Sequence, residues 1–106
     1  DAAVAAIFAV ADSTAATPGY LEFAIDATNG IIVNWGQDTV DGSGDGSDTF
    51  AHAYSSTPWV AVATSHGSGS IAAGTQITAL STTGLSYNGP GGATTCRWIA
   101  IGPSTL

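Results

Sequence analysis

The sequence predicts an all-β fold, an antiparallel β-sandwich of short strands that associates with copies of itself. Runs rich in β-branched and aromatic residues follow one another at short intervals, and Gly-rich turn segments separate them. The runs at residues 31–35 and 98–101 are apolar on both faces, so both faces need cover. One small domain covers one of these faces with its own second sheet. We therefore expect another copy of the chain to cover the other face.

Residues 1–18 are expected to form a separate N-terminal stalk or arm, and residues 19–106 to form the sandwich. In the first segment Asp1 is suited to cap a short helix with an apolar stripe that reaches Ala11, and an extended arm is the alternative. Pro18 and the glycine after it end the segment in either case.

The sandwich is expected to consist of short strands joined by turns. The strands are predicted at residues 20–25, 31–37, 49–54, 59–64, 76–81, 84–88 and 94–101. The segments between them are rich in Gly, Ser, Asn and Asp. Turns are predicted at 29–30 and 89–92, and longer loops at 41–48 and 66–74.

Alternation assigns the side chains of the two most apolar strands to opposite faces. Ile31, Val33 and Trp35 share the face opposite Ile32 and Asn34, and Cys96, Trp98 and Ala100 share the face opposite Arg97, Ile99 and Ile101. Burial of one Ile or Trp side chain is worth about 1.5–3 kcal/mol, against a total stability of about 5–15 kcal/mol. Apolar faces left in water are therefore not expected. The residues assigned to the core or to contact between subunits are Ile31, Val33, Trp35, Trp98, Ile99 and Ile101.

The composition is that of one small, weakly charged domain. The chain has 106 residues, of which 44% are hydrophobic and 8% charged, and its net charge is −7 with Arg97 as the single basic residue. Nucleic acids and anionic membranes bind proteins through several cations, so neither is an expected partner. The apolar stretch 2–11 is too short to span a bilayer and lacks a basic flank, so no membrane insertion is expected. Cys96 has no partner for an internal disulfide, which leaves a buried thiol or a disulfide between chains.

Four groups of motifs occur in a fixed order along the chain. They are GYLEF at 19–23 with NGIIVNWG at 29–36, TF at 49–50 with TPWVAVA at 57–63, STTGLSYN at 81–88, and RWIAIG at 97–102. In this order they resemble the C-terminal domains of bacteriophage tail fibre proteins. The last two groups are also similar to H-type lectins, which are trimeric carbohydrate-binding β-sandwiches. The sequence departs from the tail fibre pattern in its longer and more acidic segment around 41–48, and it lacks the proline that normally precedes the GLI-type strand.

The resemblance implies a homotrimeric fibre tip, carried outside the cell on the tail or capsid fibre of a virion. It also implies contact with other fibre or baseplate proteins, and receptor binding to bacterial surface polysaccharide during host attachment. Two alternatives stay open. One is a structural trimerisation knob without a ligand of its own, and the other is a secreted lectin similar to the H-type.

Candidate ligand-binding residues border the predicted loops or carry the single positive charge. They are His66, Tyr87, Asn88 and Arg97. Aromatic stacking, together with hydrogen bonds from Asn or His, suits a neutral glycan. Arg97 is expected to pair with Glu22 or an Asp residue, within or across subunits, or to hold a sugar hydroxyl or acid.

Neither a metal site nor an active site is expected. Asp41, Asp45 and Asp48, with Asp38 before them, supply the oxygen ligands that Ca²⁺ prefers, but their spacing fits no known motif. A solvated loop is the simpler interpretation, and no cofactor is expected. No serine lies in a GxSxG elbow and Glu22 is the only Glu, so we expect a binding protein and not an enzyme.

Overall fold

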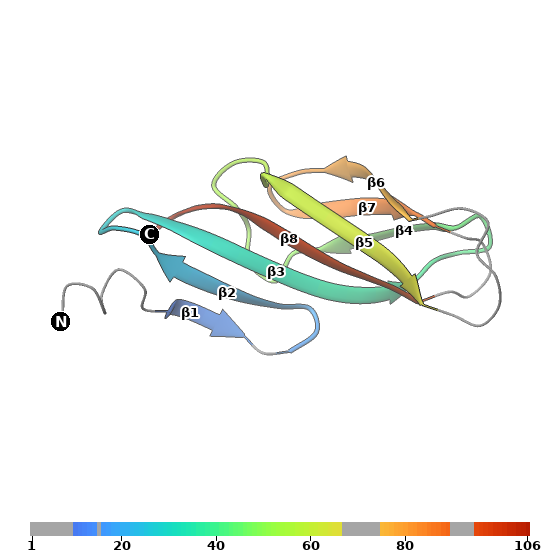
Figure 1. The fold of residues 1–106 in the computed structure, drawn as a ribbon, viewed down its shortest axis with the longest axis horizontal. Helices are drawn as coiled ribbons and strands as arrows, with labels where there is room; N and C mark the ends of the chain where they lie inside the picture. The colour runs from blue at the N-terminus through green and yellow to red at the C-terminus, as the bar shows by residue number, and fades with distance from the viewer. Residues whose placement is uncertain (1–9, 15, 67–74, 90–94) are drawn as a thin grey trace.

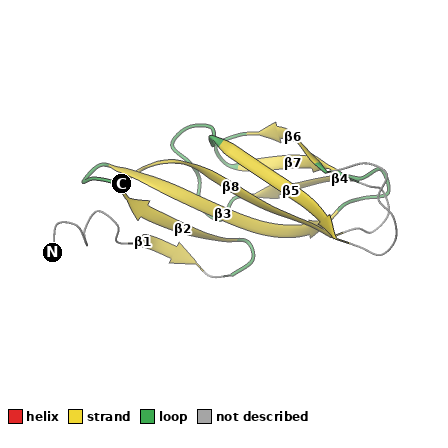
Figure 2. Ribbon diagram, in the orientation of Figure 1, coloured by secondary structure: helices red, strands yellow, loops and turns green. Residues whose placement is uncertain are grey.

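A computed structural model describes residues 10–14, 16–66, 75–89 and 95–106 of the protein. In these parts the chain forms only strands, joined by turns and loops (Figures 1 and 2). The strands are β1 (Val10–Thr14), β2 (Gly19–Ala24), β3 (Asn29–Thr39), β4 (Asp45–Thr49), β5 (Val60–His66), β6 (Gln76–Leu80), β7 (Gly84–Asn88) and β8 (Thr95–Thr105). All the pairings are antiparallel, which confirms the predicted fold class. No helix long and apolar enough to cross a membrane occurs in the described residues.

The strands form two sheets of unequal size. The larger sheet has the order β1-β2-β3-β8-β5, and the smaller sheet has the order β4-β7-β6. β3 and β8 pair along their whole length, from Asn29 opposite Thr105 to Thr39 opposite Thr95. The smaller sheet covers the larger one over the half where β3 ends and β8 begins, at the right of Figure 1. We call this end of the molecule the far end, because Leu106 and the turn at 25–28 lie together at the opposite end.

The core lies between the two sheets, as the alternation predicts. Its buried residues are Tyr20, Ile32, Val40, Phe50, Tyr54, Leu85, Tyr87, Cys96, Trp98 and Ala100. Cys96 is a free thiol and is fully buried. β3 and β8 therefore direct Ile32, Asn34, Cys96 and Trp98 inward, on the faces that the sequence assigned to them.

Two glycines allow large rings to lie across neighbouring strands. Gly36 is opposite Trp98, and a Cβ atom at Gly36 would lie 2.4 Å from Cζ2 of the indole. Gly46 is opposite Tyr87, and a Cβ atom there would lie 2.4 Å from Cε2 of the phenol ring. The indole Nε1 of Trp98 then donates to Oδ2 of Asp48 at 2.7 Å, which ties the two sheets together.

Two sequence-based boundaries are wrong around β4. Residues 50–54, predicted as part of a strand, form a loop that crosses the inner face of the larger sheet. The amide group of Asn34 bonds both backbone groups of His52, donating to its carbonyl at 2.9 Å and accepting from its N–H at 3.1 Å. The hydroxyl of Tyr54 donates to the carbonyl of Ala100 at 2.7 Å. These bonds replace a strand ladder and fix the loop over the half of the sheet that the smaller sheet leaves open.

The predicted acidic loop is in turn shorter than expected. From Asp45 onward it forms β4, which pairs with β7 along its whole length. Only the turn at 41–44 is a loop, and it closes with a hydrogen bond from the N–H of Gly44 to the carbonyl of Asp41 at 3.0 Å. Most of the predicted loops at 66–74 and 89–92 lies outside the described residues.

The N-terminal segment has an extended described part. Val10–Thr14 forms β1 at the edge of the larger sheet, so a helix that reaches Ala11 is wrong and the extended alternative applies there. Residues 1–9 lie outside the described part, so the helix expected over them stays a prediction. The carbonyl of Ala16 accepts a hydrogen bond from Nε1 of Trp35 at 3.1 Å, which holds the end of this segment against β3.

Candidate functional site

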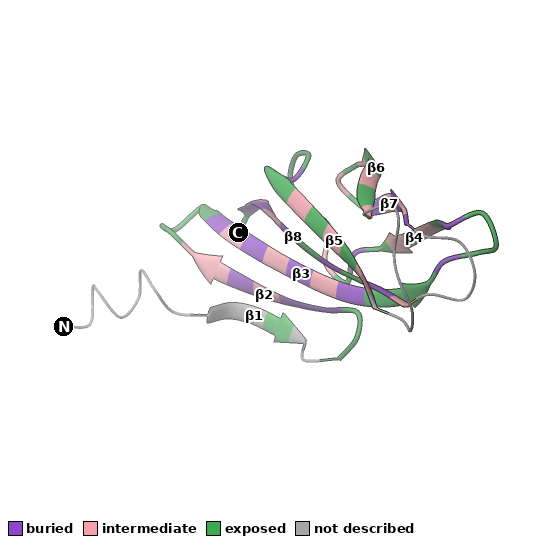
Figure 3. Ribbon diagram, turned by 45° about the vertical axis from the view of Figure 1, so that its right-hand side comes forward, coloured by how far each residue is buried: buried purple, intermediate pink, exposed green. Residues whose placement is uncertain are grey.

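The outward face of the larger sheet is apolar across four neighbouring strands. Register places Leu21, Val33, Ile101 and Val60 in one row, and Trp35, Ile99 and Val62 in a row beside it. We define the outer apolar face as Leu21, Phe23, Ile31, Val33, Trp35, Val60, Val62, Ile99, Ile101 and Pro103. Figure 3 shows the alternation along β3 and β5 that leaves this face half-buried or exposed. Contiguous apolar surface of this kind marks an interaction site.

The six residues predicted for the core or subunit contact divide between the two sides of the larger sheet. Trp98 points inward and is 3% exposed, so it is a core residue. The other five lie on the outer apolar face, namely Ile31, Val33, Trp35, Ile99 and Ile101. The sequence grouped them correctly by face but did not separate core from surface.

Arg97 lies at the border of the outer apolar face toward the far end. Its Nε donates to Oε1 of Gln37, the residue opposite it on β3, at 3.2 Å. Glu22 is buried on the inner face of β2, and Arg97 is exposed on the outer face of β8. A pairing of Arg97 with Glu22 of the same chain is therefore wrong. The guanidinium instead borders a shallow hollow of about 220 Å³ beside Val62, Thr64 and Ile99.

The far end brings several predicted residues together. Asn88 ends β7 and donates from Nδ2 to Oδ1 of Asp45 at 2.8 Å. The N–H of Gly89 donates to the carbonyl of Gly44 at 2.8 Å, and Gly44 has a φ of 87°, which favours glycine. His66 ends β5 at the same end, but its side chain lies outside the description. Polar groups from the turn at 41–44 and from the end of β7 therefore meet at this end of the smaller sheet.

The predicted sugar-contacting role of Tyr87 is wrong. Its side chain is 1% exposed and packs across Gly46 in the core, so it cannot stack on a ligand. Its hydroxyl has no hydrogen-bond partner among the described residues. Burial raises the pKa of this hydroxyl above its ordinary value, and the nearby carboxylates of Asp48 and Asp38 raise it further.

The acidic residues considered as metal ligands bond to separate partners. Oδ1 of Asp41 accepts from the N–H groups of Ser43 and Asp45 at 2.8 and 2.9 Å, within its own turn. Asp45 binds Asn88, and Asp48 binds Trp98 inside the sandwich. In the part of the chain that the structure describes, no three acidic, His or Cys side chains are grouped to hold a metal ion.

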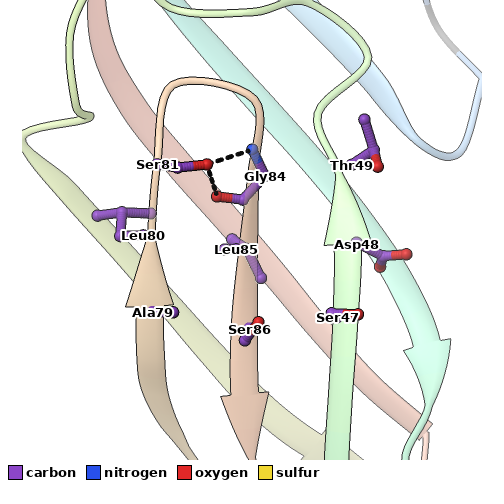
Figure 4. Close-up of a pocket in the computed structure, with 9 residues that line it drawn as sticks. All are labelled: Ser47, Asp48, Thr49, Ala79, Leu80, Ser81, Gly84, Leu85 and Ser86. Atoms are coloured by element: carbon purple, nitrogen blue, oxygen red, sulfur yellow. Dashed lines mark hydrogen bonds between the residues drawn. The ribbon is translucent and has the colours of Figure 1, made fainter.

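A further polar surface, which the sequence analysis missed, lies on the outward face of the smaller sheet. Register places Ser47, Ser86 and Ala79 in one row across β4, β7 and β6. Figure 4 shows this row beside the hairpin at 81–84, where the hydroxyl of Ser81 bonds the N–H and the carbonyl of Gly84. A hollow of about 440 Å³ lies here, and a second of about 390 Å³ shares Ser47 and Ser86 and reaches Asp41 and Asp45. The signal in the sequence was the alternation of Ser86 and Asn88 with the apolar Leu85 and Tyr87.

The fold is that of tail fibre C-terminal regions. The chain is similar to a C-terminal fragment of the R2 pyocin fibre from P. aeruginosa (22% identity, TM-score 0.68, covering 86% of this chain and 25% of that one). It is also similar to a C-terminal fragment of the P. aeruginosa R1 pyocin fibre (26%, 0.66, covering 86% and 27%). An N-truncated R1-type pyocin tail fibre matches as well (25%, 0.66, covering 86% and 84%). The chain thus spans about a quarter of the two longer fragments.

The chain belongs to the family of C-terminal domains of gp53-like tail fiber proteins, whose profile matches residues 26–103. The match confirms the tail fibre resemblance and supports a location in a virion tail. The comparison with curated proteins found no match.

Proposed function

We propose that three copies of the chain associate through their outer apolar faces to form the tip of a tail fibre, and that this tip recognises a glycan on the host cell. The observation that carries the proposal is the outer apolar face itself, which spans four strands and contains no acidic residue. Membership of a tail fibre family supports the fibre role. In that role the tip contacts other fibre or baseplate proteins and binds its receptor without catalysis.

Burial of the outer apolar face supplies the free energy for association. Val60, Val62 and Ile99 are 48%, 52% and 40% exposed in the single chain. Burying the exposed half of one such side chain is worth about 1 kcal/mol, and the other apolar residues of the face add to this. The charge of −7 on each chain opposes association only weakly, because the outer apolar face includes no acidic residue and salt screens the charges outside it. The number three comes from the resemblance to trimeric fibre tips. A closed ring of three copies buries the outer apolar face of each copy equally.

The oligomeric state tests the assembly. Native mass spectrometry and sedimentation equilibrium are expected to give three times the chain mass of 10.4 kDa. Val62→Glu is expected to give folded monomers, because it places a carboxylate in each contact. Thr78→Glu, which puts the same charge on an exposed position of the smaller sheet, is the matched control and is expected to leave the trimer intact. A wild-type chain that stays monomeric and folded at high concentration would contradict the assembly.

Glycan recognition is tested on the assembled protein. We expect it to bind whole host cells and purified surface polysaccharides, and we expect removal of the polysaccharide to abolish binding. An intact trimer that binds neither cells nor polysaccharides would favour the structural knob, which needs only the outer apolar face.

A further inference from the structure

We infer that the outward face of the smaller sheet is the glycan-binding surface of this tip, and that it takes a neutral, hydroxyl-rich polysaccharide segment. The inference rests on the proposed function and adds to it a site and a ligand class. We call this surface the hydroxyl trough and define it by six of the polar residues that line its two hollows: Asp41, Asp45, Ser47, Thr49, Thr78 and Ser86.

The shape of the trough follows from the register of the smaller sheet. Ser86 lies on the middle strand, with Ser47 on one side and Ala79 on the other, so one row carries three small side chains. Thr49 is opposite Gly84 toward the hairpin, and these short side chains leave the face hollow instead of filled. The two hollows, of about 440 and 390 Å³, meet at Ser47 and Ser86 and run from the hairpin at 81–84 to the far end. A continuous trough of this kind suits an extended chain better than a compact ligand.

The hydroxyl groups of the trough are available to a ligand. Those of Ser47, Thr49 and Ser86 make no hydrogen bond to another described residue. The hydroxyl of Ser81, at the end of the trough, is by contrast used to hold Gly84 in the hairpin. Each free hydroxyl offers one donor and two acceptor positions, which matches the hydroxyl groups of a sugar. Such a row binds a carbohydrate by exchanging hydrogen bonds with water for hydrogen bonds with sugar.

The charge of the trough selects against acidic glycans. Asp41 and Asp45 lie at its far end, and in each carboxylate Oδ1 accepts the internal hydrogen bonds. Oδ2 of each is left without a bond to another described residue, so it can accept from a sugar hydroxyl. Arg97, the single basic residue, lies on the outward face of the other sheet. The carboxylates would therefore repel an anionic polysaccharide, with no cation in the trough to compensate, whereas a neutral polysaccharide can donate hydroxyl hydrogens to these carboxylates.

The trough also stays open in the proposed assembly. Association uses the outward face of the larger sheet, and the trough lies on the opposite side of the sandwich. A trimer therefore presents three troughs outward. Simultaneous binding of several sites to a repetitive surface polymer raises the overall affinity well above that of one site.

The test uses the full chain in its native assembly and an array of bacterial surface polysaccharides. One group on the array consists of neutral glucans, mannans and galactans, and the other consists of polymers that contain uronic acid. Ser86→Tyr and Ser47→Tyr fill the trough from its middle row. Ser56→Tyr adds the same ring at an exposed loop position outside the trough and is the matched control. Circular dichroism and native mass are measured for every variant.

We expect binding to neutral polymers, a loss of affinity of about tenfold or more in Ser86→Tyr and Ser47→Tyr, and no change in Ser56→Tyr. If both trough variants are folded and assembled and still bind neutral polymers with wild-type affinity, the inference is overturned and the proposed function stands. Binding to acidic polymers alone would overturn the ligand class and hence the inference. No binding to any polymer or to host cells would overturn the proposed glycan recognition itself.

Discussion

Gly36→Ala is expected to destabilise the fold strongly, although it adds a single methyl group. The new Cβ would lie 2.4 Å from Cζ2 and 2.6 Å from Cε2 of Trp98, where ordinary contact needs more than 3.4 Å. The indole must therefore move by about 1 Å, in a core packed as densely as a crystal. Trp98 is 3% exposed, so the ring has no open space to enter.

The same displacement breaks the bond between the two sheets. Nε1 of Trp98 donates to Oδ2 of Asp48 at 2.7 Å, and a shift of this size takes the pair beyond hydrogen-bond distance. Overpacking costs about 1–3 kcal/mol, and loss of a hydrogen bond to a charged group costs about 1.5–3 kcal/mol. The expected total is about 2.5–6 kcal/mol, a large share of the stability of a domain of this size.

Urea denaturation at a fixed protomer concentration measures this loss. With a slope of about 1–3 kcal/mol per molar urea, the midpoint is expected to fall by about 1 M or more. Gly42→Ala is the matched control, because no atom lies within 4 Å of a Cβ built there. We expect it to change the stability by less than about 0.5–1 kcal/mol. A Gly36→Ala variant as stable as Gly42→Ala would refute the packing argument for Gly36 and Trp98.

Three further changes test other contacts. Asn34→Ala removes the acceptor and donor that hold His52, and it is expected to cost about 2–4 kcal/mol in urea denaturation because buried backbone groups lose their partners. Burial raises the pKa of Asp48 above its ordinary value, and the charge of Asp38 adds to the rise. The protonated carboxyl of Asp48 therefore stabilises the fold at acid pH, and this stabilisation is lost as the pH rises through the folded-state pKa. Asp48→Asn should therefore lose less stability between pH 3.5 and 7 than the wild type, and an equal loss in both would contradict this. Asp26 behaves oppositely, because hydrogen bonds from the backbone of Thr28, then from Asn29, lower its pKa to about 2. The ionised carboxylate of Asp26 therefore stabilises the fold at pH values above its ordinary pKa, and this stabilisation is lost as the pH falls toward 2. Thermal denaturation of Asp26→Ala is expected to lack this acid-side loss.

The faces of the long strands were predictable from sequence because alternation in a strand is strict. Once 31–35 and 98–101 were assigned as strands, the inward direction of Ile32 and Trp98 followed from the period of two. The outward direction of Val33 and Ile99 followed in the same way. The outer apolar face could thus be derived from the pattern of a few residues.

β4 and the trough were not predictable in this way. Residues 45–49 (DGSDT) have little intrinsic preference for a strand, and their extended form depends on pairing with β7, which comes much later in the chain. Tyr87 was assigned to a ligand because it neighbours Asn88 and a turn. Its burial depends on Gly46 of the opposite strand, which leaves room for the ring. Both errors arise from contacts between distant segments, which local patterns do not contain.

The separation of the two outward faces has a consequence for variation among fibre tips. The outer apolar face belongs to β2, β3, β8 and β5, and the hydroxyl trough belongs to β4, β7 and β6 with the adjoining turn at 41–44. The sheets are joined through inward side chains such as Trp98 and Asp48, and no trough hydroxyl takes part in that core. Under the proposed function, substitution at Ser47 or Ser86 is therefore expected to change what is bound without changing how the copies assemble. The pairing with β7 holds β4 extended, and its inward residues Gly46 and Asp48 contact Tyr87 and Trp98, so its outward positions can carry polar and acidic residues that a core position excludes.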